Sequence, residues 1–134
     1  KVKLFYYHQK SPINTLDEKI SLKQQAKIEK KIDIQTNTLE NILGNYSIKT
    51  IDLLTIDVEG FELKVLKGLN FDKYKPRVII VEFLDLEANK WEIPYNNLDN
   101  VLESEIYSFL INKNYKLVNW VNGDLVFIQK NFSY

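Results

Sequence analysis

The 134-residue sequence contains no cysteine, which excludes disulfide bonds and thiolate metal sites. This absence agrees with a cytoplasmic location, which is the location we expect. Methionine is also absent and the chain begins at Lys1, so we expect a processed chain or a fragment. The only arginine is Arg77, and the 18 basic residues balance 18 acidic ones, so we expect no nucleic-acid partner.

Glycine-rich loops and long apolar runs are missing as well. The four glycines never form a G-x-G pair, which excludes a glycine-rich cofactor loop within these residues. No apolar run approaches the roughly 20 residues of a membrane-spanning helix, and no signal-peptide pattern opens the chain. We therefore expect no membrane partner. A 45% hydrophobic content is enough for about one core, so we expect residues 1–134 to form a single domain.

The stretch Ile51–Glu62, with the sequence IDLLTIDVEGFE, organises the chain. Its apolar first half is typical of a parallel strand that is covered on both faces. Asp57 then falls at the carboxyl end of this strand, and Gly60 permits a sharp or left-handed turn. Phe61–Leu69 follows as a predicted helix with one apolar face on the sheet. This pattern places acidic side chains at one edge of a sheet.

A second strand also ends in an acid. Arg77–Phe83, with the sequence RVIIVEF, reads as a buried strand and carries Glu82 near its end. Strand, helix and strand over about thirty residues form a βαβ unit with parallel strands. Glu82 should therefore lie at the same edge as Asp57, outside the carboxyl ends of the strands, where open α/β sheets bind ligands.

The remaining elements complete an α/β fold that closes with an antiparallel hairpin. Asn122-Gly123 between two β-prone runs is a strong hairpin signal. Thr36–Thr38 offers N-cap candidates for a short helix. The other expected elements are strands Lys1–Tyr7 and Lys31–Gln35, helices Leu39–Leu43 and Leu98–Asn112, a weak helix within Leu16–Lys30, and hairpin strands Tyr115–Val121 and Leu125–Gln129.

Three further residues, all in predicted loops, are candidates for a role in a site. We interpret His8 as a surface histidine in a loop, with a catalytic base as the alternative. Trp91 and Tyr95 lie in the predicted loop Asp85–Asn97, which follows the second acidic strand. Packing is the preferred role for both rings, and stacking on a sugar acceptor is the alternative.

The segments TLENIL, IDLLTIDVEGFELKVLKGL, KPRVIIVEF, YKLVNW and LVFIQK together resemble the FkbM family of S-adenosylmethionine-dependent methyltransferases. The resemblance covers roughly Ile32–Lys130. It implies a partial Rossmann-like class I methyltransferase fold, in which Ile51–Ile56 corresponds to the fourth strand and Val78–Phe83 to the fifth. It also implies S-adenosylmethionine as the cofactor.

The same resemblance assigns the site. Asp57 matches the position near the transferred methyl group, Glu59 belongs to the family signature, and Glu82 matches the acid that ends the fifth strand. These three are the implied catalytic residues, Asp57 and Val58 the implied cofactor contacts, and no metal is implied. Thr55 stands where the family typically has lysine. The family's first strands would precede the chain, so we expect these residues alone to bind the cofactor weakly or not at all.

The implied reaction is O-methyl transfer to a hydroxyl of a sugar or secondary metabolite. Asp57 or Glu82 would then be the general base, with Glu59 orienting the substrate or supporting the loop. In a purely structural interpretation, Glu59 and Glu62 stabilise the following helix through its dipole. Two other functions stay open. One is a non-catalytic α/β interaction module, and the other is a metal-dependent glycosyltransferase that uses Asp57-Val58-Glu59. Beyond a small-molecule or glycan acceptor, the partner expected is a second copy, paired through an exposed sheet edge.

Overall fold

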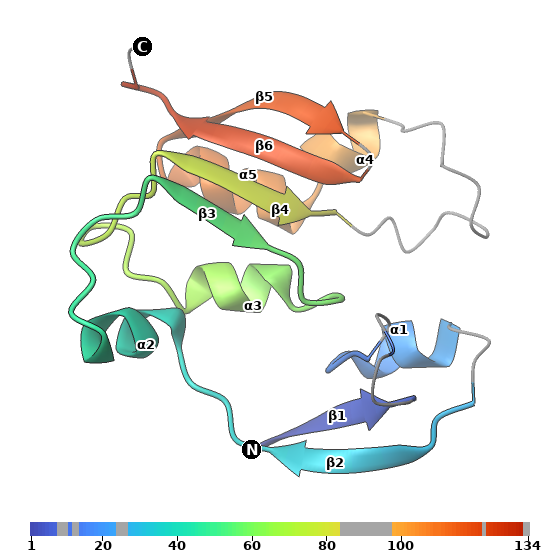
Figure 1. The fold of residues 1–134 in the computed structure, drawn as a ribbon. Coiled ribbons are helices and arrows are strands. Elements are labelled where there is room, and N and C mark those ends of the chain that lie inside the picture. Colours follow the sequence, from blue (N-terminus) through green and yellow to red (C-terminus); the bar gives the residue numbers. More distant parts are fainter. Residues whose placement is uncertain (8–10, 12–13, 24–26, 84–97, 122, 133–134) are drawn as a thin grey trace.

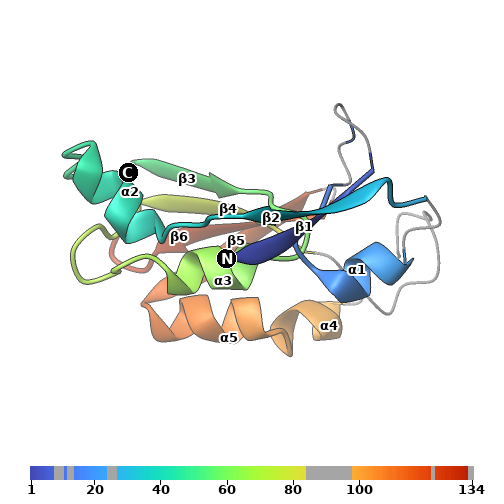
Figure 2. The same cartoon turned by 90° about the horizontal axis from the view of Figure 1, so that it is seen from below.

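The structure is a computed structural model that describes residues 1–7, 11, 14–83, 98–121 and 123–132 except for 24–26. Its largest unit is a four-stranded sheet in the order β3-β4-β6-β5, and β1 and β2 form a separate two-stranded sheet (Figure 1). Helices α3, α4 and α5 lie on one side of the larger sheet (Figure 2). His8, Trp91 and Tyr95 lie outside the described residues.

The four-stranded sheet confirms the predicted βαβ unit and hairpin. Strand β3 (Leu53–Ile56) pairs in parallel with β4 (Val78–Glu82), and α3 (Glu62–Lys67) joins them. Strand β6 (Asp124–Gln129) lies antiparallel between β4 and β5 (Tyr115–Val121). The carboxyl ends of β3 and β4 therefore point to the same edge of the sheet.

The core lies between this sheet and its helices. Alternate side chains of β4 and β6 face the helices, because successive residues of a strand point to opposite faces. Ile79 and Val81 on β4 are fully buried, as are Leu125 and Phe127 on β6. Leu66 and Leu110 from α3 and α5 (Glu105–Asn112) pack into the same cluster. This packing fixes the strand ends that carry the acids.

The prediction that the strand within Ile51–Glu62 is covered on both faces is wrong for the described residues. Leu54 and Ile56 pack toward the core, whereas the side chain of Leu53 is 56% exposed and Thr55 is also exposed. Helices α3, α4 and α5 lie on one face of the sheet (Figure 2), and β3 is the edge strand. An apolar run alone does not report which neighbours cover its second face.

The prediction of one helix over Leu98–Asn112 is also wrong. The structure has α4 (Leu98–Leu102) and then α5 as a separate helix. Ser104 interrupts them with an extended backbone (φ −68°, ψ 149°), and its Oγ accepts a hydrogen bond from the Tyr107 amide at 3.1 Å. The apolar spacing continues across the break, so it concealed a serine N-cap.

The amino-terminal residues form their own small unit. Strand β1 (Val2–Tyr6) pairs antiparallel with β2 (Lys30–Ile34), and α1 (Glu18–Lys23) lies between them in the chain. Helix α2 (Leu39–Asn45) then begins as predicted, because Thr38 Oγ1 accepts a hydrogen bond from the Asn41 amide at 3.3 Å. Among the described helices, none is long and apolar enough to cross a membrane.

Candidate active site

Three carboxylates meet at the carboxyl ends of β3 and β4. Asp57 directly follows β3, Glu59 lies in the next turn, and Glu82 is the last residue of β4. One oxygen from each lies within 4.8 Å of the others. The predicted placement of Asp57 and Glu82 at one edge is therefore confirmed, and Glu59 joins them.

Burial raises the pKa of Glu82 to about 8, and the nearby charge of Asp57 is the next cause. The Oε2 atom of Glu82 is buried and has no hydrogen-bond partner among the described residues, an arrangement that disfavours the ionised form. Burial also raises the pKa of Glu59, followed by the charges of Asp57 and Glu62. At neutral pH, Glu82 therefore holds a proton beside the solvent-exposed Asp57.

The turn after β3 has a conformation that depends on glycine. Glu59 and Gly60 both have positive φ angles, of 53° and 99°. A Cβ atom added to Gly60 would lie 2.0 Å from Ile20 Cδ1, which is shorter than any real contact. The predicted left-handed turn at Gly60 is confirmed, and the close approach of α1 gives a second reason for the glycine.

Glu62 holds this turn from inside. Its side chain is 3% exposed, and its Oε1 accepts hydrogen bonds from the amides of Val58 and Gly60, both at 3.0 Å. Glu62 is the first residue of α3, so a favourable contact with the helix dipole remains part of its role. The main role of Glu62 was not predicted from the sequence: its buried carboxylate accepts hydrogen bonds from two backbone amides next to the acidic cluster.

Thr15 holds the same turn from outside. Its side-chain hydroxyl donates a hydrogen bond to the backbone carbonyl of Glu59, across 44 positions of sequence. Thr15 is 1% exposed and belongs to the segment between β1 and α1. This contact could not be predicted from the sequence, because one threonine in a weakly patterned segment has no distinctive spacing.

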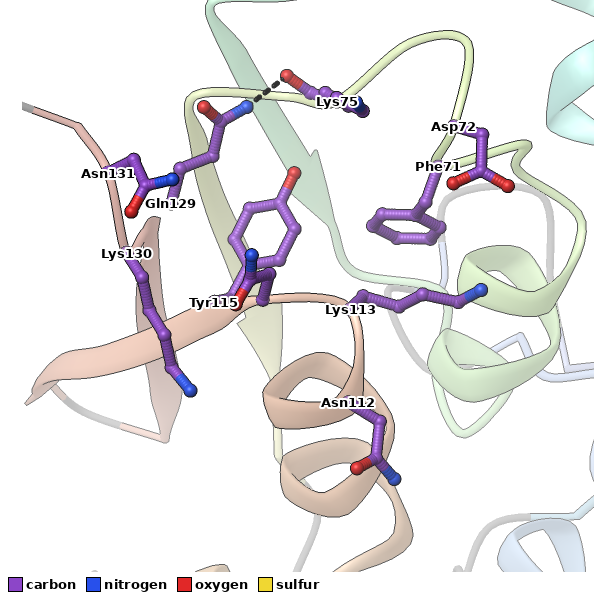
Figure 3. A pocket seen from close by; sticks show the side chains of 10 residues that line it. Phe71, Asp72, Lys75, Asn112, Lys113, Tyr115, Gln129, Lys130 and Asn131 are labelled. Atoms are coloured by element: carbon purple, nitrogen blue, oxygen red, sulfur yellow. Dashed lines mark hydrogen bonds between the residues drawn. The ribbon is translucent and has the colours of Figure 1, made fainter.

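A separate hollow lies at the opposite end of the sheet (Figure 3). Its volume is about 410 Å³, and Tyr115 and Gln129 of the hairpin line it together with three lysines. The Tyr115 hydroxyl donates to the Pro76 carbonyl at 2.6 Å, just before β4 begins. The hollow is therefore at the amino end of β4 and is not part of the acidic cluster.

The acidic cluster can perform two kinds of chemistry. A carboxylate can accept a proton from a substrate hydroxyl, and Asp57 is exposed enough to reach one. The three oxygens are also close enough together to contact one cation, and those carboxyl groups that are ionised attract either a divalent metal or a sulfonium. Geometry alone leaves this choice open.

The chain contains a parallel βαβ unit with acidic side chains at the carboxyl ends of its strands. This arrangement is typical of α/β proteins that bind a ligand at that edge of the sheet. A family model, described as the methyltransferase FkbM domain, matches residues 3–117. The chain thus belongs to the FkbM family of S-adenosylmethionine-dependent methyltransferases. No curated protein and no solved structure matched the chain. The family match begins within β1, so it extends further toward the amino terminus than the resemblance over Ile32–Lys130, which begins within β2.

Proposed function

We propose that the full-length protein that carries this domain catalyses O-methyl transfer from S-adenosylmethionine to a hydroxyl of a sugar or secondary metabolite. The observation that carries the proposal is the meeting of Asp57, Glu59 and Glu82 within 4.8 Å at the carboxyl ends of two parallel strands. Family membership supplies the methyl donor, and the acids supply a way to accept the hydroxyl proton.

The acidic cluster fits the charge of the proposed cofactor. When bound, S-adenosylmethionine supplies an electrophilic methyl group on a positively charged sulfur. The carboxylates at this edge lower the energy of a positive charge beside them, and Asp57 is the most exposed of the three. The assignment of Asp57 and Val58 as cofactor contacts stays a prediction. The Val58 amide is already bonded to Glu62, so a Val58 contact would come from its side chain or carbonyl.

Asp57 is the proposed general base. Its carboxylate is exposed, whereas Glu82 keeps its proton until the pH reaches about 8. At neutral pH the Glu82 hydroxyl donates a hydrogen bond and helps to orient the acceptor or the Asp57 carboxylate. Above pH 8, Glu82 becomes a second candidate base. Glu59 orients the substrate from the turn. Much of the rate acceleration comes from this positioning of the acceptor oxygen in line with the methyl group.

The experiment is a transfer assay with the full-length protein that carries these residues and S-adenosylmethionine labelled in its methyl group. Simple sugars and phenolic or aliphatic alcohols serve as hydroxyl acceptors, with amine and thiol analogues as matched controls. We expect label in base-stable methyl ethers. Transfer only to amines or thiols, or no transfer to any acceptor while the cofactor binds, would contradict the proposal.

The spacing of the three carboxyl oxygens is also compatible with a metal-dependent glycosyltransferase. A glycosyltransferase would use Asp57 and Glu59 to hold a divalent metal and a sugar-nucleotide diphosphate. Manganese at micromolar concentrations would then broaden the NMR signals of Asp57 and Glu59, and the protein would bind a nucleotide sugar only when manganese is present. Membership of a methyltransferase family argues against this result.

A further inference from the structure

Thr15 connects the amino-terminal unit to the acidic cluster. Its backbone forms a bridge with Phe5 of β1, in which the Phe5 amide donates to the Thr15 carbonyl at 2.8 Å. The Thr15 amide donates back to the Phe5 carbonyl at 3.3 Å. Strand β1 is itself paired along its whole length with β2. The position of the Thr15 side chain is therefore fixed by the amino-terminal unit.

The hydroxyl of Thr15 acts both as a hydrogen-bond donor and as an acceptor. It donates to the Glu59 carbonyl and accepts from the Asp17 amide at 3.0 Å. Because Thr15 is almost completely buried, water cannot easily replace either bond. Removal of the hydroxyl would leave the Glu59 carbonyl without this partner.

The Glu59 carbonyl is the part of the turn that Glu62 does not hold. The carboxylate of Glu62 binds the amides on either side, those of Val58 and Gly60. Glu59 itself has a φ angle of 53°, a conformation that costs a residue with a side chain about 1 kcal/mol or more. Thr15 thus bonds directly to the strained residue, Glu59. Ile20 of α1 lies next to Gly60, the following residue of the turn.

We propose that Thr15 is a positioning residue for the acidic cluster: its hydroxyl fixes the Glu59 backbone and so keeps the Glu59 carboxylate beside Asp57 and Glu82. This inference rests on the proposed function for its catalytic meaning, since it matters for catalysis only when the acids act in methyl transfer. The structural part of the inference does not depend on the proposed function, because it concerns only the position of the Glu59 carboxylate. The amino-terminal unit therefore contributes to the geometry of the site through Glu59.

The test is a titration of the side-chain carboxyl groups of Glu59 and Glu82 by carbon NMR in the 134-residue chain. Thr15→Val removes the hydroxyl and keeps the shape, whereas Thr15→Ser keeps the hydroxyl. In Thr15→Val we expect the pKa of Glu59 to fall toward its ordinary value of 4.5, because the freed side chain moves into solvent. The pKa of Glu82 falls by less, because Glu59 is only one of the charges that raise it. Thr15→Ser restores both.

Ser21→Ala is the matched control. Ser21 is another buried hydroxyl of the amino-terminal unit, and it accepts a hydrogen bond from the Tyr7 hydroxyl at 3.2 Å. We expect Ser21→Ala to lower the unfolding temperature and to leave both titrations unchanged. If Thr15→Val lowers the unfolding temperature but shifts neither titration, Thr15 only stabilises the fold and the proposal is overturned.

A second measurement covers the case in which Thr15→Val does not fold. The buried Thr15 hydroxyl proton should exchange slowly with water in the unaltered chain and show a nuclear Overhauser effect to Glu59 or Gly60. Rapid exchange with no such effect would overturn the proposal. Neither measurement uses methyl transfer, so a failure of the proposed function and a failure of this inference can be told apart.

Discussion

Replacement of Glu82 by glutamine should make the folded protein more stable at alkaline pH and change little at acidic pH. The pKa of Glu82 is about 8 in the folded state and 4.5 ordinarily, so the fold favours the protonated form. The contribution of Glu82 to the free energy of unfolding is therefore complete below pH 4.5. It declines as the pH rises above 4.5 and is lost once the pH has passed 8. Glutamine mimics the protonated form, so Glu82→Gln removes this loss.

The rise in pKa would correspond to roughly 5 kcal/mol at full strength. Glu82 is only partly buried, and solvent screens its interactions, so we expect about 1–2 kcal/mol. In thermal unfolding at pH 8.5, Glu82→Gln should therefore melt roughly 3–8 °C above the unaltered chain. At pH 4.5 the two melting temperatures should agree.

The assay is circular dichroism or calorimetry of both proteins at intervals between pH 4.5 and pH 9. Glu103→Gln is the matched control, because Glu103 is an exposed glutamate between α4 and α5. It should not change the pH dependence. The reasoning is refuted if Glu82→Gln and the unaltered chain lose stability in parallel over this range, since Glu82 would then not be the group that titrates.

Further predictions concern the turn and the cofactor. Glu62→Ala should lower the free energy of unfolding by about 2–4 kcal/mol in urea, because two partly buried amides lose their carboxylate partner. The control is Glu105→Ala, at the first residue of α5, which should lower the free energy of unfolding by less than about 1 kcal/mol. Equal losses in the two variants would mean that Glu62 acts only through the helix dipole. Gly60→Ala should cost more than about 2 kcal/mol through backbone strain and overlap with Ile20, whereas Gly44→Ala, with open space around it, should be neutral or stabilising. Calorimetry of residues 1–134 should detect no micromolar binding of S-adenosylmethionine, because no glycine-rich loop is present. A micromolar dissociation constant would contradict this last expectation.

The parts of the site that follow local rules could be predicted from the sequence. Asp57 and Glu82 each end an apolar run, and the parallel strands of a βαβ unit have their carboxyl ends at one edge. Gly60 marked the left-handed turn for a similar local reason. These inferences need only the residues near each position and the general rules of α/β folds.

The parts that depend on distant contacts could not be predicted. The bond from Thr15 to Glu59 joins segments 44 residues apart, and nothing in either segment specifies the other. The break at Ser104 was hidden because the apolar positions continue on both sides of it. The exposure of Leu53 depends on which elements cover the second face of the sheet, and an apolar run does not encode that.

The most direct test of the central claim is the rate of methyl transfer by the full-length protein after Asp57→Asn. Asparagine keeps the shape of the side chain and cannot accept the hydroxyl proton, so we expect kcat to fall by about 100-fold or more. Asp72→Asn, an exposed aspartate at the opposite end of the sheet, is the control and should leave the rate unchanged. Equal rates for Asp57→Asn and the unaltered protein would remove Asp57 from the mechanism and contradict the assignment of the acidic cluster as the active site.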